Sequence, residues 1–201
     1  GMVDQAVWKA GQRFNDAGIR FLPAINEDLA ATAVLGTQRV ESDPERTVDG
    51  VFAMWYGKGP GVDRAGDALK HGHAYGSSPH GGVLVVAGDD HGCVSSSMPH
   101  QSDAAFQAWG LPVVSPADLS DVIEFGLYGY ALSRFSGGWV GLTALSEVVE
   151  SGSTVDLDVI ATTGAALAQR RSDARREPAG GDEEAGVSVH AVLGPHGQTF
   201  E

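Results

Sequence analysis

The chain is poor in cysteine and in basic residues. Cys93 is its single cysteine among 201 residues, which excludes an internal disulfide, a four-cysteine zinc site and an iron–sulfur cluster ligated by this chain alone. Only 13 Lys and Arg residues stand against 26 Asp and Glu, for a formal net charge of −13. Such a charge repels nucleic-acid phosphates and anionic lipids, so we expect neither nucleic acid nor a membrane as a partner.

Long hydrophobic runs are missing as well. No apolar stretch reaches the roughly 18 residues that a membrane-spanning helix needs. Asp4, Gln5 and Lys9 interrupt the first residues, so these lack the apolar core of a signal peptide. With the lone cysteine, these absences predict a cytoplasmic protein. Apolar and small residues are plentiful: 42% of the chain is hydrophobic and 28 residues are glycine, enough for one sizeable core.

Short apolar runs alternate with segments of helical periodicity. We predict strands at 19–25, 48–56, 82–88, 111–114 and 139–143 and helices over 4–17, 26–36, 62–73, 105–109, 116–130 and 157–171. This order is typical of a parallel α/β sheet with helices on both faces, a three-layer α/β/α domain. The unbroken apolar run 82–88 should lie centrally in the sheet. Ser115-Pro116-Ala117-Asp118 is typical of a capping box and predicts the start of the helix that runs to residue 130, the clearest helix start in the chain.

The composition changes after Arg171. We predict an α/β domain over residues 1–171, a flexible linker over 172–186 that is rich in Asp, Glu, Arg, Pro, Ala and Gly, and a tail over 187–201. Residues 187–192 alternate in polarity and indicate a strand, with no signal for the strand that it pairs with.

Ligands of parallel α/β sheets gather where strands end, so the segments that follow strands are the places to search. The first is 26–28, where Glu27 opens a predicted helix. An acid in a first turn commonly stabilises the helix dipole. Beside small apolar residues, such a carboxyl group can instead exchange a proton with a bound heterocycle. Both interpretations remain open from the residues alone.

Two further segments follow predicted strands. Residues 56–61 include Gly57-Lys58-Gly59-Pro60-Gly61, which lacks the spacing of a phosphate-binding loop and favours a tight structural turn, with Lys58 available to an anion. Residues 89–102 are a dense polar cluster, which we interpret as a loop that lines a site. A metal-dependent hydrolase using Asp90, His91 and His100 is a weaker alternative, because the spacing matches no familiar zinc motif.

Taken in order, several segments resemble the pyrimidine-binding domain of thiamine-diphosphate-dependent 2-oxoacid ferredoxin oxidoreductases of the indolepyruvate type. The resemblance extends from about Ile19 to Val155. It is carried by Asn26-Glu27-Asp28-Leu29-Ala30-Ala31-Thr32-Ala33, Met54-Trp55-Tyr56-Gly57-Lys58-Gly59-Pro60-Gly61-Val62-Asp63-Arg64, Ser78-Pro79-His80-Gly81-Gly82, Gly88-Asp89-Asp90-His91, Ser95-Ser96, Pro99-His100-Gln101-Ser102 and Tyr128-Gly129-Tyr130-Ala131-Leu132-Ser133-Arg134.

The resemblance implies a function and a set of site residues. Thiamine diphosphate would lie between this domain and a separate diphosphate-binding domain, and Glu27 would hydrogen-bond N1′ of its aminopyrimidine, which helps to remove the C2 proton. The same resemblance places Asn26, Tyr56, Asp90 and His91 at the cofactor and Ser96, His100 and Gln101 on the substrate side. Magnesium and iron–sulfur clusters belong to other domains. Ferredoxin and coenzyme A are the implied partners, and a homodimer the implied assembly.

The chain also departs from this family. The opening strand with its Gly-Tyr-x-Gly-Ser-Pro-like turn is missing, as is the signature that binds diphosphate and magnesium. We therefore expect a fragment or subunit that has no turnover alone. The alternative is a non-catalytic binding or assembly module of the same fold.

Overall fold

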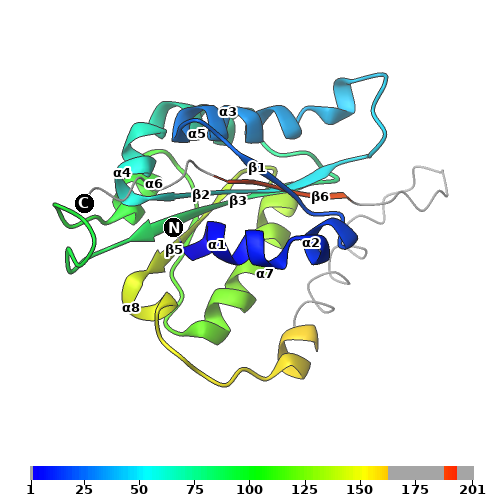
Figure 1. Ribbon diagram of the computed structural model, residues 1–201. Helices are drawn as coiled ribbons and strands as arrows, with labels where there is room; N and C mark the ends of the chain where they lie inside the picture. The colour runs from blue at the N-terminus through cyan, green and yellow to red at the C-terminus, as the bar shows by residue number, and fades with distance from the viewer. Residues whose placement is uncertain (1, 163–187, 194–201) are drawn as a thin grey trace.

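The computed structural model describes residues 2–162 and 188–193 (Figure 1). Its helices are α1 (Met2–Ala10), α2 (Gln12–Asp16), α3 (Glu27–Thr37), α4 (Gly59–Arg64), α5 (Gly66–Tyr75), α6 (Ser102–Ala108), α7 (Leu119–Ser136), α8 (Ser146–Val149) and the short 3-10 helix η1 (Val40–Ser42). Its strands are β1 (Arg20–Pro23), β2 (Val51–Lys58), β3 (Gly82–Asp89), β4 (Val113–Val114), β5 (Val140–Leu145) and β6 (Ser188–Leu193).

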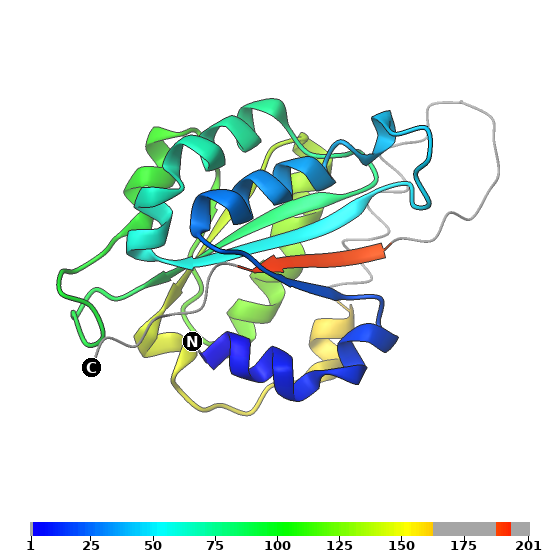
Figure 2. The same cartoon turned by 45° about the horizontal axis from the view of Figure 1, so that its top comes forward.

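The strands form one sheet in the order β1-β6-β2-β3-β5-β4, and every neighbouring pair is parallel. Helices α3 and α5 cover one face, and α1, α2 and α7 lie on the other (Figures 1 and 2). The predicted three-layer α/β/α class is confirmed, as is the central place of the apolar run in β3.

Alternation along the strands divides the core between the two faces. Trp55 of β2, Leu69 of α5 and Phe106 of α6 belong to the larger cluster and are fully buried. Leu84 of β3 points to the opposite face, where Tyr130 of α7 packs against the same smaller cluster. Fully burying one large apolar side chain stabilises the fold by about 1.5–3 kcal/mol, so both faces contribute to holding the helices on the sheet.

The segment near the end of the chain is part of the sheet. Strand β6 lies between β1 and β2, and its His190 is in register with Arg20 of β1 and with Ala53 of β2. Residues 157–162 are helical, as predicted. The remainder of the helix that we predicted to Arg171, and the predicted linker over 172–186, lie outside the described residues.

Within the described part of the chain, no helix has both the length and the apolar character that crossing a bilayer requires.

Two helix boundaries differ from the prediction. The first helix is interrupted at Gly11, whose φ of 36° is unfavourable for other residues, and it continues as α2. The longest helix is capped by Asp118, whose Oδ1 accepts a hydrogen bond from the Asp121 main-chain N–H at 2.9 Å. The predicted cap at Ser115 is therefore wrong; that hydroxyl instead accepts a hydrogen bond from Thr143 Oγ1 at 3.0 Å.

Helical glycines differ in the space around them, which gives a test of the packing. A Cβ atom at Gly72 of α5 would lie 2.2 Å from the ring of buried Trp139, whereas Gly126 of α7 has no heavy atom within 4 Å of that position. We expect Gly72→Ala to lower the free energy of unfolding by about 1–3 kcal/mol through overpacking. Gly126→Ala should raise it by up to about 1 kcal/mol, because alanine favours helix. Urea denaturation measures both, and equal effects would contradict the packing described.

Candidate functional site

Three segments of the chain meet at the carboxyl end of the sheet. Helix α3 begins shortly after β1, α4 begins directly after β2, and the loop 90–101 connects β3 to α6. Helix α4 contacts both α3 and α6, so it lies between the other two segments. The predicted site segments are thus brought together around α4.

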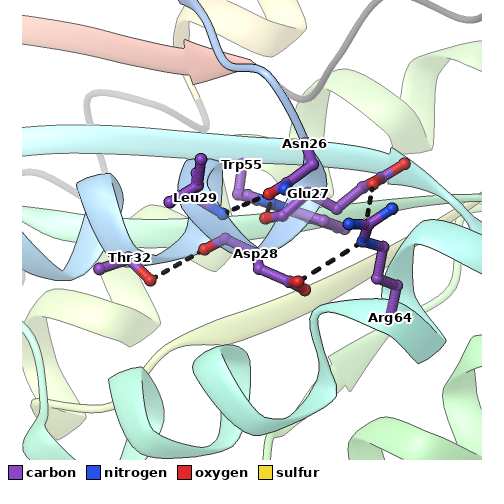
Figure 3. Close-up of polar contacts among 7 residues, drawn as sticks. All are labelled: Asn26, Glu27, Asp28, Leu29, Thr32, Trp55 and Arg64. Atoms are coloured by element: carbon purple, nitrogen blue, oxygen red, sulfur yellow. Dashed lines mark hydrogen bonds and ion pairs between the residues drawn. The ribbon is translucent and has the colours of Figure 1, made fainter.

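The main chain of Glu27 is fixed from two sides (Figure 3). Asn26 caps α3, because its Oδ1 accepts a hydrogen bond from the Leu29 N–H at 2.9 Å. The indole Nε1 of Trp55 donates to the Glu27 carbonyl at 3.1 Å. Asn26 thus supplies the side-chain cap of α3, and Glu27 stands in the first turn, where an acid also interacts favourably with the helix dipole.

The Glu27 side chain is three-quarters buried, with 23% of it exposed, and it packs on the backbone of α4. Its Oε2 lies 3.8 Å from Arg64 Nε, and the same nitrogen lies 3.5 Å from Asp28 Oδ2. Figure 3 shows both carboxylates directed toward the one guanidinium. Since 56% of the Arg64 side chain is exposed, solvent weakens both ion pairs, and we assign them to orientation more than to stability.

The glycine-rich segment 57–61 is a strand end and a helix start, so the predicted turn is wrong. Residues up to Lys58 belong to β2, and α4 begins at the next residue. A large side chain instead packs against each glycine. A Cβ atom at Gly57 would lie 2.5 Å from the Trp55 ring. The corresponding distances are 2.4 Å from Gly59 to His100 Cβ and 2.7 Å from Gly61 to Glu27 Cγ. The glycines therefore permit close packing and form no phosphate nest.

Asp90 organises the loop after β3. It is buried, and its carboxylate accepts hydrogen bonds from the main-chain N–H groups of Ser95 at 2.7 Å and Val94 at 2.9 Å, and from the Ser95 hydroxyl at 3.2 Å. These hydrogen bonds lower the pKa of Asp90 below its ordinary value, and the bond from the Ser95 main-chain N–H has the largest effect. Lys58 Nζ donates to the Ser95 carbonyl and ties the loop to β2. The lysine that we considered for an anion is thus engaged with the main chain.

The far end of this loop is anchored by a residue to which we assigned no role. Asp89 is buried, and its carboxylate accepts hydrogen bonds from the Ser102 N–H at 2.7 Å and hydroxyl at 2.6 Å. The sequence feature that could have indicated this role is an acid, Asp89, at the last position of an apolar strand. Of the predicted ligands in the same loop, His91 and Gln101 are exposed.

His100 returns from the loop to α4. Its Nε2 lies 3.1 Å from Asp63 Oδ2, and its Nδ1 lies 3.3 Å from the Met98 carbonyl. Only 18% of its side chain is exposed. Asp63 directly precedes Arg64, so consecutive residues of α4 contact His100 on one side and Glu27 on the other. Among the described residues, no three His, Cys, Asp or Glu side chains are placed to share a metal ion.

Three buried side-chain oxygens near this end of the sheet have no hydrogen-bond partner among the described residues: Asp28 Oδ1, Tyr56 Oη and Ser96 Oγ. Folded proteins seldom leave such atoms unsatisfied, and a bound ligand or water is a common explanation. Tyr56 leaves β2 on the face opposite its neighbour Trp55. The structure therefore separates Tyr56 from Glu27, while Asp28 and Ser96 belong to the segments on either side of α4.

No protein-family model and no curated protein matches this sequence.

The hydrogen bonds to Asp90 generate a pH-dependent prediction. Because its pKa is lower in the folded chain, its contribution to stability is complete above the unfolded-state pKa of about 4 and is lost as pH falls through the folded-state value. We expect Asp90→Asn to reduce the free energy of unfolding at pH 7, with the difference from wild type shrinking below about pH 4. Urea titrations at several pH values measure this. Asp103→Asn, which removes an exposed carboxylate of α6, should give a smaller and flatter difference, and equal profiles would contradict the role of Asp90.

Proposed function

We propose that this chain is the pyrimidine-binding portion of a thiamine-diphosphate-dependent 2-oxoacid ferredoxin oxidoreductase of the indolepyruvate type, which catalyses oxidative decarboxylation. One observation carries the proposal. The Glu27 carboxylate is held largely buried beside Gly61 at the carboxyl end of the sheet, and the side-chain cap of α3 is supplied by its neighbour Asn26.

The residues present fit a polar aromatic ring. Glu27 offers a carboxylate against a glycine surface, and unsatisfied oxygens of Asp28 and Ser96 lie in the adjoining segments. Both kinds of group are hydrogen-bond partners for ring and exocyclic nitrogens. When bound, thiamine diphosphate would supply the centre that adds to the 2-oxoacid carbonyl and stabilises the negative charge that decarboxylation leaves.

The geometry ranks the remaining cofactor residues. The Asn26 side chain is used in capping, and the Asp90 carboxylate is used by Val94 and Ser95, so these two would act by shaping the site. Tyr56 lies on the other face of β2, and His91 is exposed. Glu27 is therefore the residue of this set for which we propose direct contact with the aminopyrimidine.

The chemical task proposed for Glu27 is to share a proton with the ring nitrogen of an aminopyrimidine that it would hold. A carboxyl group does this efficiently when it is held in place and screened from water, because proton transfer then needs no search for geometry. The packing on Gly61 and the contact with Arg64 hold the Glu27 carboxyl group in place, and only 23% of the Glu27 side chain is exposed to water. His100, Ser96 and Gln101 lie in the loop on the other side of α4, which suits a substrate side.

The electron-transfer steps require partners. Cys93 alone cannot hold an iron–sulfur cluster, so clusters, ferredoxin contact and diphosphate binding are assigned to other domains or subunits. Exposed apolar side chains close to the candidate site support a covering domain: Ile25 is 87% exposed, Val94 79% and Met98 65%. Apolar surface of this kind commonly marks an interface. The same residues also suit the alternative, a non-catalytic assembly module.

Substitution of Glu27 separates the two functions. In an enzyme reconstituted from this chain with its diphosphate-binding and ferredoxin-like partners, thiamine diphosphate and coenzyme A, we expect Glu27→Gln to lower 2-oxoacid-dependent dye reduction by about 10²–10⁴-fold, the usual contribution of a positioned proton-transfer group. Glu45→Gln, an exposed residue before β2, is the matched control and should retain full activity. Equal rates for the two variants with an intact fold would favour the assembly module.

The isolated chain should show no 2-oxoacid-dependent reduction of ferredoxin or dye, because it lacks the cysteines that clusters need. The assay uses the purified chain with thiamine diphosphate, magnesium and coenzyme A. Turnover under these conditions would contradict the proposed division of the site between domains.

A further inference from the structure

We propose that Asp63 is a positioning residue, which fixes the rotation of the His100 ring and holds a proton on Nε2, so that His100 does not serve the site as a base. The inference deepens the proposed function and rests on it for the substrate-side location of His100. The state of the ring follows from contacts within this chain.

The contacts of the two ring nitrogens determine where protons can lie. Nε2 faces Asp63 Oδ2 at 3.1 Å, and an ionised carboxylate only accepts hydrogen bonds, so Nε2 must donate. Nδ1 faces the Met98 carbonyl at 3.3 Å, which is again an acceptor. Neither nitrogen therefore presents a lone pair to a substrate proton, and a base role for His100 does not suit this arrangement.

The ring is also fixed in space. The backbone of Gly59 lies against His100, where a Cβ atom would come within 2.4 Å of the histidine Cβ. The main-chain N–H of His100 donates to the Asp90 carbonyl at 3.4 Å. Packing on α4 and the anchored loop thus set the position of the ring, while Asp63 sets its rotation and the location of its proton.

Helix α4 consequently connects the two halves of the candidate site. Asp63 orients His100, and the next residue, Arg64, lies 3.8 Å from the Glu27 carboxylate and 3.5 Å from that of Asp28. The other charged groups attached to this loop are Lys58 of β2, which binds the Ser95 carbonyl, and Asp90.

The test is the protonation pattern of the His100 ring in the full chain without cofactor. Long-range 1H–15N spectra at pH 7 report which ring nitrogen carries the proton, and His100→Gln assigns the signals by their disappearance. In the wild type we expect a protonated Nε2. Asp63→Ala removes the acceptor of the Nε2 proton and should shift the His100 Nε2 signal toward the average of a ring that exchanges between tautomers, whereas Asp63→Glu should restore most of the wild-type pattern. Asp63 is 66% exposed, so neither change threatens folding.

The chain offers a matched control pair. Asp67 lies 3.3 Å from His71 Nδ1 on the exposed surface of α5, so Asp67→Ala removes an Asp–His contact outside the site and should leave the His100 signals in place. Identical His100 signals in wild type and Asp63→Ala would overturn the positioning role. If the ring signals change but Asp63→Ala changes neither kcat nor KM for the 2-oxoacid in the reconstituted enzyme, the substrate-side part of the proposal is overturned, and the role of Glu27 is tested separately by Glu27→Gln.

Discussion

The candidate site depends on the close approach of side chains to the backbone of segment 57–61. Helix α4 can lie between α3 and the loop 90–101 only because its glycines present no side chain to Glu27 and His100. The same absence lets the Trp55 ring fold over the end of β2, where its indole reaches the Glu27 carbonyl. A methyl group at any of these glycines would displace a residue of the candidate site, so the segment acts as a spacer of fixed and minimal thickness.

Charge is used locally in a chain whose overall charge is strongly negative. The ion pairs of Arg64 with Glu27 and Asp28 are exposed enough that their free energies are small. What they provide is direction, because each fixes a long side chain that would otherwise sample several rotamers. The buried acids Asp89 and Asp90 behave differently, since main-chain N–H groups satisfy them and give the loop its shape. Glu27 and Asp28 thus orient the Arg64 side chain, whereas Asp89 and Asp90 determine the structure of the loop.

The sequence predicted the class of fold and the gathering of the three segments, because apolar strands and periodic helices follow from local patterning. It did not predict the cap at Asp118 in place of Ser115, since both residues are common caps and tertiary contacts decide between them. It also missed the roles of Asp63 and Asp89. Their function lies in partners such as His100 and Ser102, which folding brings to them, and no spacing rule reveals such pairs.

The position of β6 has a consequence for how the chain acquires its structure. Strand β1 is the edge strand whose neighbour in the sheet is β6, so residue 20 finds its partner only after residue 190 has been made. Pairing across such a separation in sequence closes a very long loop and delays folding. On the ribosome, β2, β3 and β5 can assemble as their helices emerge, whereas the first strand must wait for the last. Strand β1 is thus the part of the sheet whose pairing depends on the synthesis of residues 188–193.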